Sequence, residues 1–450
     1  MKNRRWAGKR SGIAFGAVAL ILTALVVPYA CAGTTGAVPF SGDNPSSGTR
    51  TVTIADITDF HGHIERGADN ATAFTVADSH NPGNMIPVST GDLVGGSPYE
   101  SAVEKDQPTL DMAKAWGLTI SAIGNHEFDR GVADFNNRIA DPSNGIDWLC
   151  ANASAANKSP DGLLSHVRDS TIRTVNGKRI GFVGALTDAL GSVATPQITR
   201  DADLDERAVD AINRVARELK RSGKVDAVVA LLHADASAAA DIGRDVDVVY
   251  TGHSHAIKHG TTAGGAPIYE AGSFGRNMAV QDLIITGAGR RATVRVADVD
   301  LGNGTSHTAV DGFNAHPAQA AWMSAGAEEN DEVSRAQHIY QASATYANHT
   351  GSAVIGTLAS GVNFDKQGSD KHGNTVGVLV ADANRESIMK HVYAGNRLPV
   401  IGFSNNGSLR TPRLDMNGDG KVTVRDRDTM QQERIPVDKL EDYIAAKLVF

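Results

Sequence analysis

The chain has 450 residues, a net charge of −8 and 41% hydrophobic residues. This length allows about three domains of roughly 150 residues each, and the hydrophobic content is sufficient for large cores, which excludes a globally disordered protein. After the first ten residues, no block of Lys and Arg is interleaved with aromatic residues. The sequence therefore gives no support for binding of a nucleic-acid polymer through a basic face.

The first 32 residues have the pattern of an export signal. Basic residues between positions 2 and 10 precede an apolar run over residues 11–27, and residues 30–32 form a small-residue cleavage site. We therefore predict a signal peptide over residues 1–32 and a secreted or cell-envelope protein, with no transmembrane span after cleavage.

Two alternatives to a cleaved signal stay open. The apolar run is about the shortest that can cross a bilayer, so it could be a membrane anchor, and Cys31 could carry a lipid. After cleavage, Cys150 would be the only cysteine, so no disulfide could form within the chain. Residues 33–50 are rich in Gly, Ser, Thr and Pro, which predicts a flexible tether.

Five apolar, β-branched runs follow, and each ends in a polar cluster. The runs cover residues 51–57, 85–89, 118–123, 225–232 and 246–251. Helical patterns lie between them, such as residues 205–222, whose apolar residues share one face at 3.6 spacing. This alternation predicts a mostly parallel sheet covered on both faces. The carboxyl ends of its strands would gather the polar clusters at one edge.

The side chains in these clusters are of the kind that bind metal. They are two carboxylates, four imidazoles and one amide: Asp59, His61, Asp92, Asn125, His233, His253 and His255. Such nitrogen and oxygen donors suit Zn, Mn, Fe or Co. Seven residues can hold two divalent ions if one carboxylate bridges, and Asp92 is the natural bridge. A hydroxide shared between two ions is a strong nucleophile near neutral pH, so no nucleophilic Ser or Cys is required.

Each of these residues also has an ordinary alternative. A lone histidine such as His233 is more often a hydrogen-bonded core or surface residue than a ligand, and an aspartate after a strand is often a turn former or helix cap. The joint occurrence of metal-type residues at five strand ends favours the metal centre.

In chain order, these clusters resemble the five sequence blocks of the calcineurin-like metallophosphoesterases. The blocks are Asp59-Phe60-His61, Gly91-Asp92, Gly124-Asn125-His126-Glu127, His233 and Gly252-His253-Ser254-His255. More narrowly, TDFHGHIE and GNHEFDRG are similar to the secreted bacterial 5′-nucleotidase and UDP-sugar hydrolase branch. The resemblance implies an α/β fold, with a four-layer α/β/β/α sandwich over residues 51–305.

The resemblance also implies a role for each site residue. One ion would be held by Asp59, His61, Asp92 and His255, and the other by Asp92, Asn125, His233 and His253. Asn125 would also contact the substrate. His126 would lie beside the phosphoryl group, oriented by Asp129, where an imidazolium can stabilise developing charge or protonate the leaving alkoxide. Glu127 is expected to be structural, and His63 is left outside the site.

The rest of the chain is expected to form a linker helix region and a partial α/β domain. The linker region covers residues 306–349, with a helix over about 316–346, and residues 350–450 resemble the substrate-binding C-terminal domain of 5′-nucleotidases, with a strand at 398–403. Arg410 is the phosphate candidate, because a planar guanidinium binds phosphate bidentately. Lysines stand before Val376 where family members place arginines, and the block after Arg410 lacks the family's aromatic residue.

Residues 415–426 fit two interpretations. Oxygen donors at loop positions 1, 3, 5 and 12 match an EF-hand or dockerin-type calcium loop; these are Asp415, Asn417, Asp419 and Asp426. The same residues also fit a hairpin in which Val422 and Val424 belong to a strand. One bound Ca is therefore an alternative, in addition to the two divalent ions.

These observations predict an exported, two-metal phosphoesterase with a small-molecule substrate. Nucleoside 5′-monophosphates are the leading class, and a phosphodiester or pyrophosphate, such as a cyclic nucleotide or UDP-sugar, is the alternative. From a different class of function, the chain could be a non-catalytic cell-surface binding module. The sequence does not indicate the oligomeric state.

Overall fold

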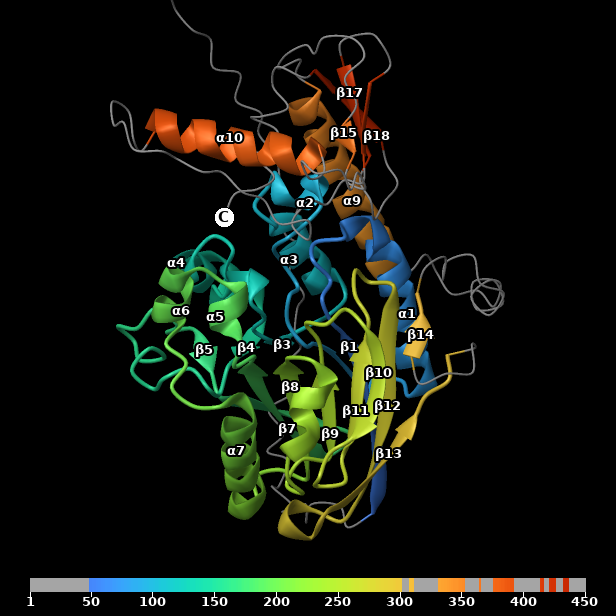
Figure 1. Ribbon diagram of the computed structural model, residues 1–450. Helices are drawn as coiled ribbons and strands as arrows, with labels where there is room; N and C mark the ends of the chain where they lie inside the picture. Colours follow the sequence, from blue (N-terminus) through green and yellow to red (C-terminus); the bar gives the residue numbers. More distant parts are fainter. Residues whose placement is uncertain are drawn as a thin grey trace, which may run out of the picture. The chain divides into compact units, whose positions relative to one another are not determined.

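The computed structural model describes residues 48–301, 307–310, 331–352, 364–365, 375–391, 413–416, 421–425 and 432–436. The chain divides into residues 1–43 and residues 44–450, and all described residues lie in the second unit. Their strands form three β-sheets (Figure 1). The predicted signal peptide and most of the predicted tether lie outside the described residues.

The first sheet has the strand order β13-β12-β1-β2-β3-β4-β5, and β14 pairs with β12. In that order the strands are Thr293–Asp298, Asn277–Thr286, Thr49–Ile57, Met85–Ser89, Ile120–Ala122, Asp147–Leu149 and Val167–Arg168, with β14 at His307–Ala309. Strands β1 to β5 run parallel, whereas β12 pairs antiparallel with β1, β13 and β14. Strands β1, β2 and β3 correspond to the apolar runs predicted over residues 51–57, 85–89 and 118–123.

The second sheet has the order β10-β11-β9-β8-β7-β6. These strands are Ile257–Thr261, Pro267–Ala271, Val248–Thr251, Ala227–His233, Lys178–Leu186 and Ser170–Val175. The four inner strands are parallel, and β10 and β6 are antiparallel edges. The expectation of one mostly parallel sheet is therefore wrong, because β8 and β9 belong to a different sheet from β1. Strands buried on both faces all read as continuous apolar runs, which do not show which sheet they join.

A buried apolar cluster lies between the two sheets. Ile54 and Val88 of the first sheet pack in it with Val229 and Tyr250 of the second. Two further clusters cover the outer faces of the sheets with helices. The fold is thus mixed α/β with two mixed sheets, as the four-layer sandwich requires.

Helix α7, Ala208–Ser222, covers the outer face of the second sheet. Its buried residues include Ile212, Val215 and Leu219, which repeat at helical spacing, as predicted. The helix ends at Ser222, and the next residue, Gly223, has a φ of 69°, a left-handed conformation that suits glycine at a helix C-terminus.

The outer face of the first sheet packs against α1 (Gly67–His80), α3 (Gln107–Ala115) and α9 (Asp331–Gly351). Helix α9 is the described part of the predicted linker helix, and it buries Ala336 in this cluster. The shorter helices are α2 (Tyr99–Ala102), α4 (Val132–Asp134), α5 (Leu190–Val193) and α6 (Pro196–Ala202). Among the described helices, none combines the length and apolar content needed to cross a bilayer.

The third sheet is antiparallel, in the order β15-β16-β17-β18. Its strands are Phe364–Asp365, Arg413–Met416, Lys421–Arg425 and Gln432–Pro436, and α10 spans Thr375–His391. Strand β17 contains Val422 and Val424 and pairs with β16, as the hairpin interpretation requires. Asn417, Asp419 and Asp426 lie outside the described residues, as do the predicted strand at 398–403 and Arg410, so the calcium loop stays a prediction.

Candidate metal centre

Five strands, β1, β2, β3, β8 and β9, bring the candidate ligand residues together at their carboxyl ends. Three groups of side chains place ligand atoms within 4.8 Å of one another: Asp59-His61-His255, His61-Asp92-His126 and Asp92-His233-His253. Six of the seven residues predicted as ligands belong to these groups. Two of the groups share His61, and two share Asp92, so the three form one continuous cluster.

The backbone at these strand ends is bent into an uncommon conformation. Five of the residues predicted as ligands have positive φ angles: Asp59 (49°), His61 (49°), Asp92 (49°), His253 (73°) and His255 (58°). Left-handed backbone at residues other than glycine costs of order 1–3 kcal/mol each and is typical of functional sites. These turns direct the side chains of neighbouring positions into the same cluster.

Glycines allow the strand ends to approach one another closely. A Cβ at Gly124 would lie 2.1 Å from Oδ1 of Asp92, and a Cβ at Gly252 would lie 2.2 Å from Oγ1 of Thr58. Neither distance is compatible with a side chain at these positions. The glycines that follow β3 and β9 are therefore required so that the carboxylates can occupy the centre.

Asp92 lies at the middle of the cluster. Its Oδ2 is 3.2 Å from Nε2 of His233 and 3.6 Å from Nε2 of His61, while its Oδ1 accepts a hydrogen bond from the backbone N–H of His126 at 2.8 Å. Burial alone would raise the pKa of Asp92, but His233, His126 and His61 together lower it well below its usual range. One carboxylate thus faces imidazoles from both sheets.

Backbone carbonyls determine which nitrogen of two histidines carries a proton. Nδ1 of His61 lies 2.7 Å from the carbonyl of Gly95, and Nδ1 of His233 lies 2.8 Å from the carbonyl of Thr90. A carbonyl can only accept, so each Nδ1 donates, and a neutral ring presents a lone pair at Nε2. Burial lowers the pKa of His61 well below its usual range, which favours the neutral ring. Nε2 of both rings faces Asp92, so a positive charge there, from a proton or from a bound metal ion, would stabilise the arrangement.

The pKa of His233 also indicates a position that favours positive charge. Burial alone would lower its pKa, but the carboxylate of Asp92, with Asp59 and Glu127, raises it to about 10. This position therefore attracts positive charge, which a bound metal ion would supply in place of a proton.

Asp59 and His255 form the other end of the cluster. Nε2 of His255 lies 3.3 Å from Oδ1 of Asp59 and 3.1 Å from Nε2 of His61. The carboxylate of Asp59 is oriented by the backbone N–H of His253, at 3.0 and 2.9 Å, and by the hydroxyl of Thr58, at 2.7 Å. Two imidazole nitrogens beside one carboxylate oxygen are a suitable donor set for a divalent ion.

Two buried polar atoms test whether the site fits metal. Among the described residues, Oδ1 of Asn125 and Nε2 of His233 are buried without a hydrogen-bond partner. A buried polar atom without a partner is costly, and a metal ion would satisfy both. The residues present therefore fit a pair of divalent ions bound by nitrogen and oxygen.

His126 and Asp129 lie at the more open side of the cluster. Nδ1 of His126 is 3.0 Å from Oδ2 of Asp129, which also accepts the backbone N–H of Gly96 at 2.9 Å. The His126 side chain is 31% exposed, whereas those of His61 and His233 are 0% exposed. The two side chains thus form a pair, and His126 is accessible to a ligand from solvent.

The sequence indicated a structural role for Glu127 without showing how it acts. Its carboxylate accepts four backbone N–H groups: those of Asp92, Leu93, Val94 and Gly124. Burial and the nearby Asp92 raise the pKa of Glu127 to about 8, while the N–H donors act in the opposite direction. The side chain ties the loop after β2 to the loop after β3.

Phe274 is a site residue that the sequence did not reveal. Its ring packs against the rings of His61, His63 and His255, with centroids 5.7, 4.5 and 5.0 Å away. Its backbone N–H donates to the carbonyl of Asp59 at 2.7 Å. His63 is buried beside it and hydrogen-bonds Glu65 at 2.7 Å, so it supports the site from outside the cluster. No local sequence pattern marks Phe274, because its contacts come from a distant strand end.

Family models match two parts of the chain. The model described as calcineurin-like phosphoesterase matches residues 52–256, which contain every candidate ligand. A model described as an anticodon binding domain matches residues 415–447, a stretch much shorter than a typical domain.

Three curated relatives show the range of proteins to which the chain is similar. Cell wall protein Lmo0130 of Listeria monocytogenes is 23% identical over 86% of this chain and 54% of its own length. Endonuclease YhcR of Bacillus subtilis is 27% identical over 48% of this chain and 19% of its own. A 2′,3′-cyclic-nucleotide 2′-phosphodiesterase/3′-nucleotidase of Haemophilus influenzae is 26% identical over 45% and 36%. The chain thus spans about half the length of the first of these relatives and less of the others.

Solved structures share the fold. The NAD nucleotidase of Haemophilus influenzae superposes with a TM-score of 0.52 at 16% identity, over 75% of this chain and 68% of that one. A 5′-nucleotidase precursor of Thermus thermophilus gives 0.51 at 18% identity, over 77% and 68%. Residues 52–256 therefore form a calcineurin-like phosphoesterase domain, with homologues and structural neighbours that are 5′-nucleotidases and related nucleotide phosphoesterases.

Proposed function

We propose that the chain is a metal-dependent phosphoesterase that hydrolyses phosphate monoesters, with nucleoside 5′-monophosphates as the leading substrate class. The observation that carries this proposal is the arrangement around Asp92. The Nε2 atoms of His61 and His233, whose rings are oriented by backbone carbonyls, lie 3.6 and 3.2 Å from one carboxylate oxygen. A divalent ion bound between these atoms would satisfy the carboxylate and both imidazoles.

The seven predicted ligands divide between two ions. Asp59, His61, Asp92 and His255 would hold one, and Asp92, Asn125, His233 and His253 the other. Bound divalent ions of the Zn, Mn, Fe or Co class would supply Lewis acidity and lower the pKa of water toward neutrality.

His126 and Asp129 would act on the substrate itself. With Nδ1 of His126 held by Asp129 at 3.0 Å, its Nε2 is the atom that can donate a proton. A protonated ring beside the phosphoryl group stabilises negative charge on its oxygens and can protonate the leaving alkoxide. The partial exposure of His126 is consistent with access for the substrate.

The substrate class rests on the relatives and on the C-terminal residues. Two of the structural neighbours are named as nucleotidases, and Arg410 is the proposed phosphate contact within residues 350–450. A phosphodiester or pyrophosphate is the second candidate, because one relative is named as a cyclic-nucleotide phosphodiesterase.

We also infer that the chain is exported. The support is the signal-peptide pattern of residues 1–32 and the relative named as a cell wall protein. The proposed domains are those predicted from the sequence, with the phosphoesterase domain over residues 51–305 and the C-terminal domain over residues 350–450.

The test is phosphate release from AMP, from a cyclic nucleotide and from an aryl phosphate, after chelation and with Mn or Zn added back. We expect metal-dependent release that is fastest from AMP. Release from the aryl phosphate alone would mean that the metal centre works without a nucleoside pocket. No release from any substrate by fully metal-loaded protein would favour the non-catalytic binding module.

A further inference from the structure

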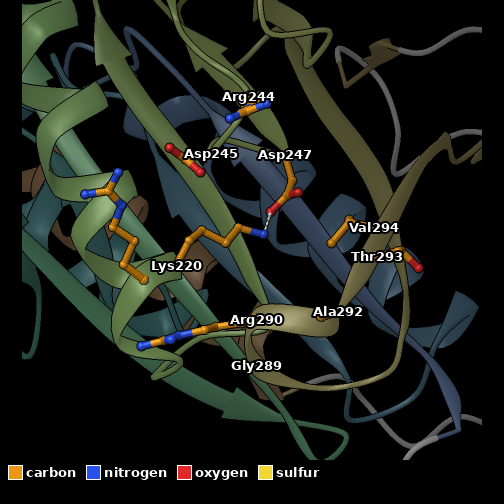
Figure 2. A pocket seen from close by; sticks show the side chains of 10 residues that line it. Lys220, Arg244, Asp245, Asp247, Gly289, Arg290, Ala292, Thr293 and Val294 are labelled. Carbon is orange, nitrogen blue, oxygen red and sulfur yellow. Dashed lines mark hydrogen bonds and ion pairs between the residues drawn. The ribbon is translucent and has the colours of Figure 1, made fainter.

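A basic pocket of about 700 Å³ lies away from the metal centre. Figure 2 shows the side chains that line it. It is formed by the C-terminal end of α7, the loop before β9 and the turn between β12 and β13. Its charged lining residues are Lys220, Arg221, Arg244, Asp245, Asp247 and Arg290. A volume of this size is typical of ligand-binding sites.

The pocket lies at the amino ends of the parallel strands, opposite the metal centre. Strand β8 begins at Ala227, just after α7, and ends at His233. Seven strand residues at about 3.3 Å each separate the two ends by roughly 20 Å. The turn after β12 also belongs to this end, because Thr286 pairs with Thr49 at the start of β1. A ligand in the pocket therefore cannot touch the metal centre.

An ion pair forms the less exposed part of the pocket. Nζ of Lys220 lies 2.7 Å from Oδ2 of Asp247, and these side chains are only 19% and 16% exposed. Asp247 also accepts the backbone N–H of Val228 at 2.7 Å. The charge of Lys220 is thus neutralised, and the pair is held in place by β8.

The arginines around this pair are not neutralised in the same way. Asp245 pairs with Arg217 at 3.9 Å. Within the described part of the chain, Arg221, Arg244 and Arg290 are exposed and have neither a hydrogen bond nor an ion pair. Figure 2 shows Arg244 and Arg290 on opposite sides of the pair between Lys220 and Asp247. Three uncompensated positive charges therefore surround one pocket in a protein whose net charge is −8.

The chemistry of the lining selects the class of ligand. Guanidinium groups bind phosphate through two parallel hydrogen bonds, and charges on opposite sides of a pocket suit a ligand with more than one phosphate. The lining contains no aromatic side chain on which a base could stack. We propose that this pocket binds a ligand with two or more linked phosphate groups, and that it recognises the phosphates alone.

The test uses metal-loaded, full-length protein and methylenediphosphonate, a linked diphosphate analogue whose bridging carbon resists hydrolysis. Calorimetric titration in 0.15 M salt compares Arg244→Ala/Arg290→Ala with Arg200→Ala/Arg207→Ala. The second variant removes the same charge from exposed arginines outside the pocket. Both variants retain the metal centre, so any binding of methylenediphosphonate to the metal centre should be the same in both.

We expect the native protein and the Arg200/Arg207 variant to show a binding event that the Arg244/Arg290 variant weakens at least tenfold. Hydrolysis of an aryl phosphate should be the same in both variants, and the binding comparison holds even if no substrate is hydrolysed. Equal binding by the two variants would overturn the proposal, as would equally tight binding of citrate, because a site for any trianion does not recognise phosphates.

Discussion

Addition of one methyl group at Gly124 should disrupt the metal centre without replacing any proposed ligand. A Cβ at this position would lie 2.1 Å from Oδ1 and 2.5 Å from the backbone nitrogen of Asp92. Gly124 does not have a left-handed φ, so Gly124→Ala introduces a clash without backbone strain. Movement of the carboxylate alone would not relieve the clash with the backbone nitrogen, so Asp92 must shift as a whole, against the hydrogen bond of 3.0 Å that its N–H donates to Glu127.

The size of the effect follows from the cost of overpacking a rigid site. Overpacking by one methyl typically costs about 1–3 kcal/mol. If that strain is relieved by displacing Asp92, metal affinity falls by the same free energy, which is about 5- to 150-fold at 1.4 kcal/mol per tenfold change.

The assay is metal content after dialysis against graded chelator, together with thermal unfolding with and without added Zn or Mn. Gly191→Ala is the matched control, since its new methyl would meet nothing closer than 3.7 Å, at Thr199. We expect the control to keep native metal affinity. Native affinity and stoichiometry in Gly124→Ala would refute the reasoning, because Asp92 could then move without loss of metal.

Four further substitutions separate the roles within the site. His126→Ala should retain metal and lower kcat by about 10²-fold, as for loss of a general acid; metal loss on elemental analysis would instead make His126 a ligand. Asp129→Asn should lower kcat by about 10- to 100-fold, because a charge-assisted hydrogen bond contributes about 1.5–3 kcal/mol; an unchanged kcat would show that His126 is oriented by other groups. Asp92→Ala should strip metal, and unchanged metal content would contradict a bridging role. Glu127→Gln should lower the free energy of unfolding of the metal-free protein, measured by denaturant titration, by about 2 kcal/mol or more, because the NH₂ group of glutamine cannot accept from two of the four N–H groups. As a control, Glu206→Gln changes a partly exposed carboxylate in the same way and should alter the free energy of unfolding little.

The sequence by itself determined five strands of the first two sheets and the residues at their ends. Apolar, β-branched runs predicted β1, β2, β3, β8 and β9, because strand formation in a covered sheet depends on residue type and run length, which are local properties. The residues after those runs predicted a metal centre, because the preference of carboxylates and imidazoles for metal is also a property of residue type.

Only the tertiary structure decided how those ends meet. The division of strands between two sheets, three of the four N–H contacts of Glu127 and the packing of Phe274 join residues that are far apart in the sequence. The same is true of the pair between His233 and the carbonyl of Thr90, separated by 143 positions. A pattern of residue types carries no register between distant segments, so contacts of this kind arise only when the sheets pack. The basic pocket has the same origin, because its arginines come from three separate segments, and only the fold brings their charges to one place.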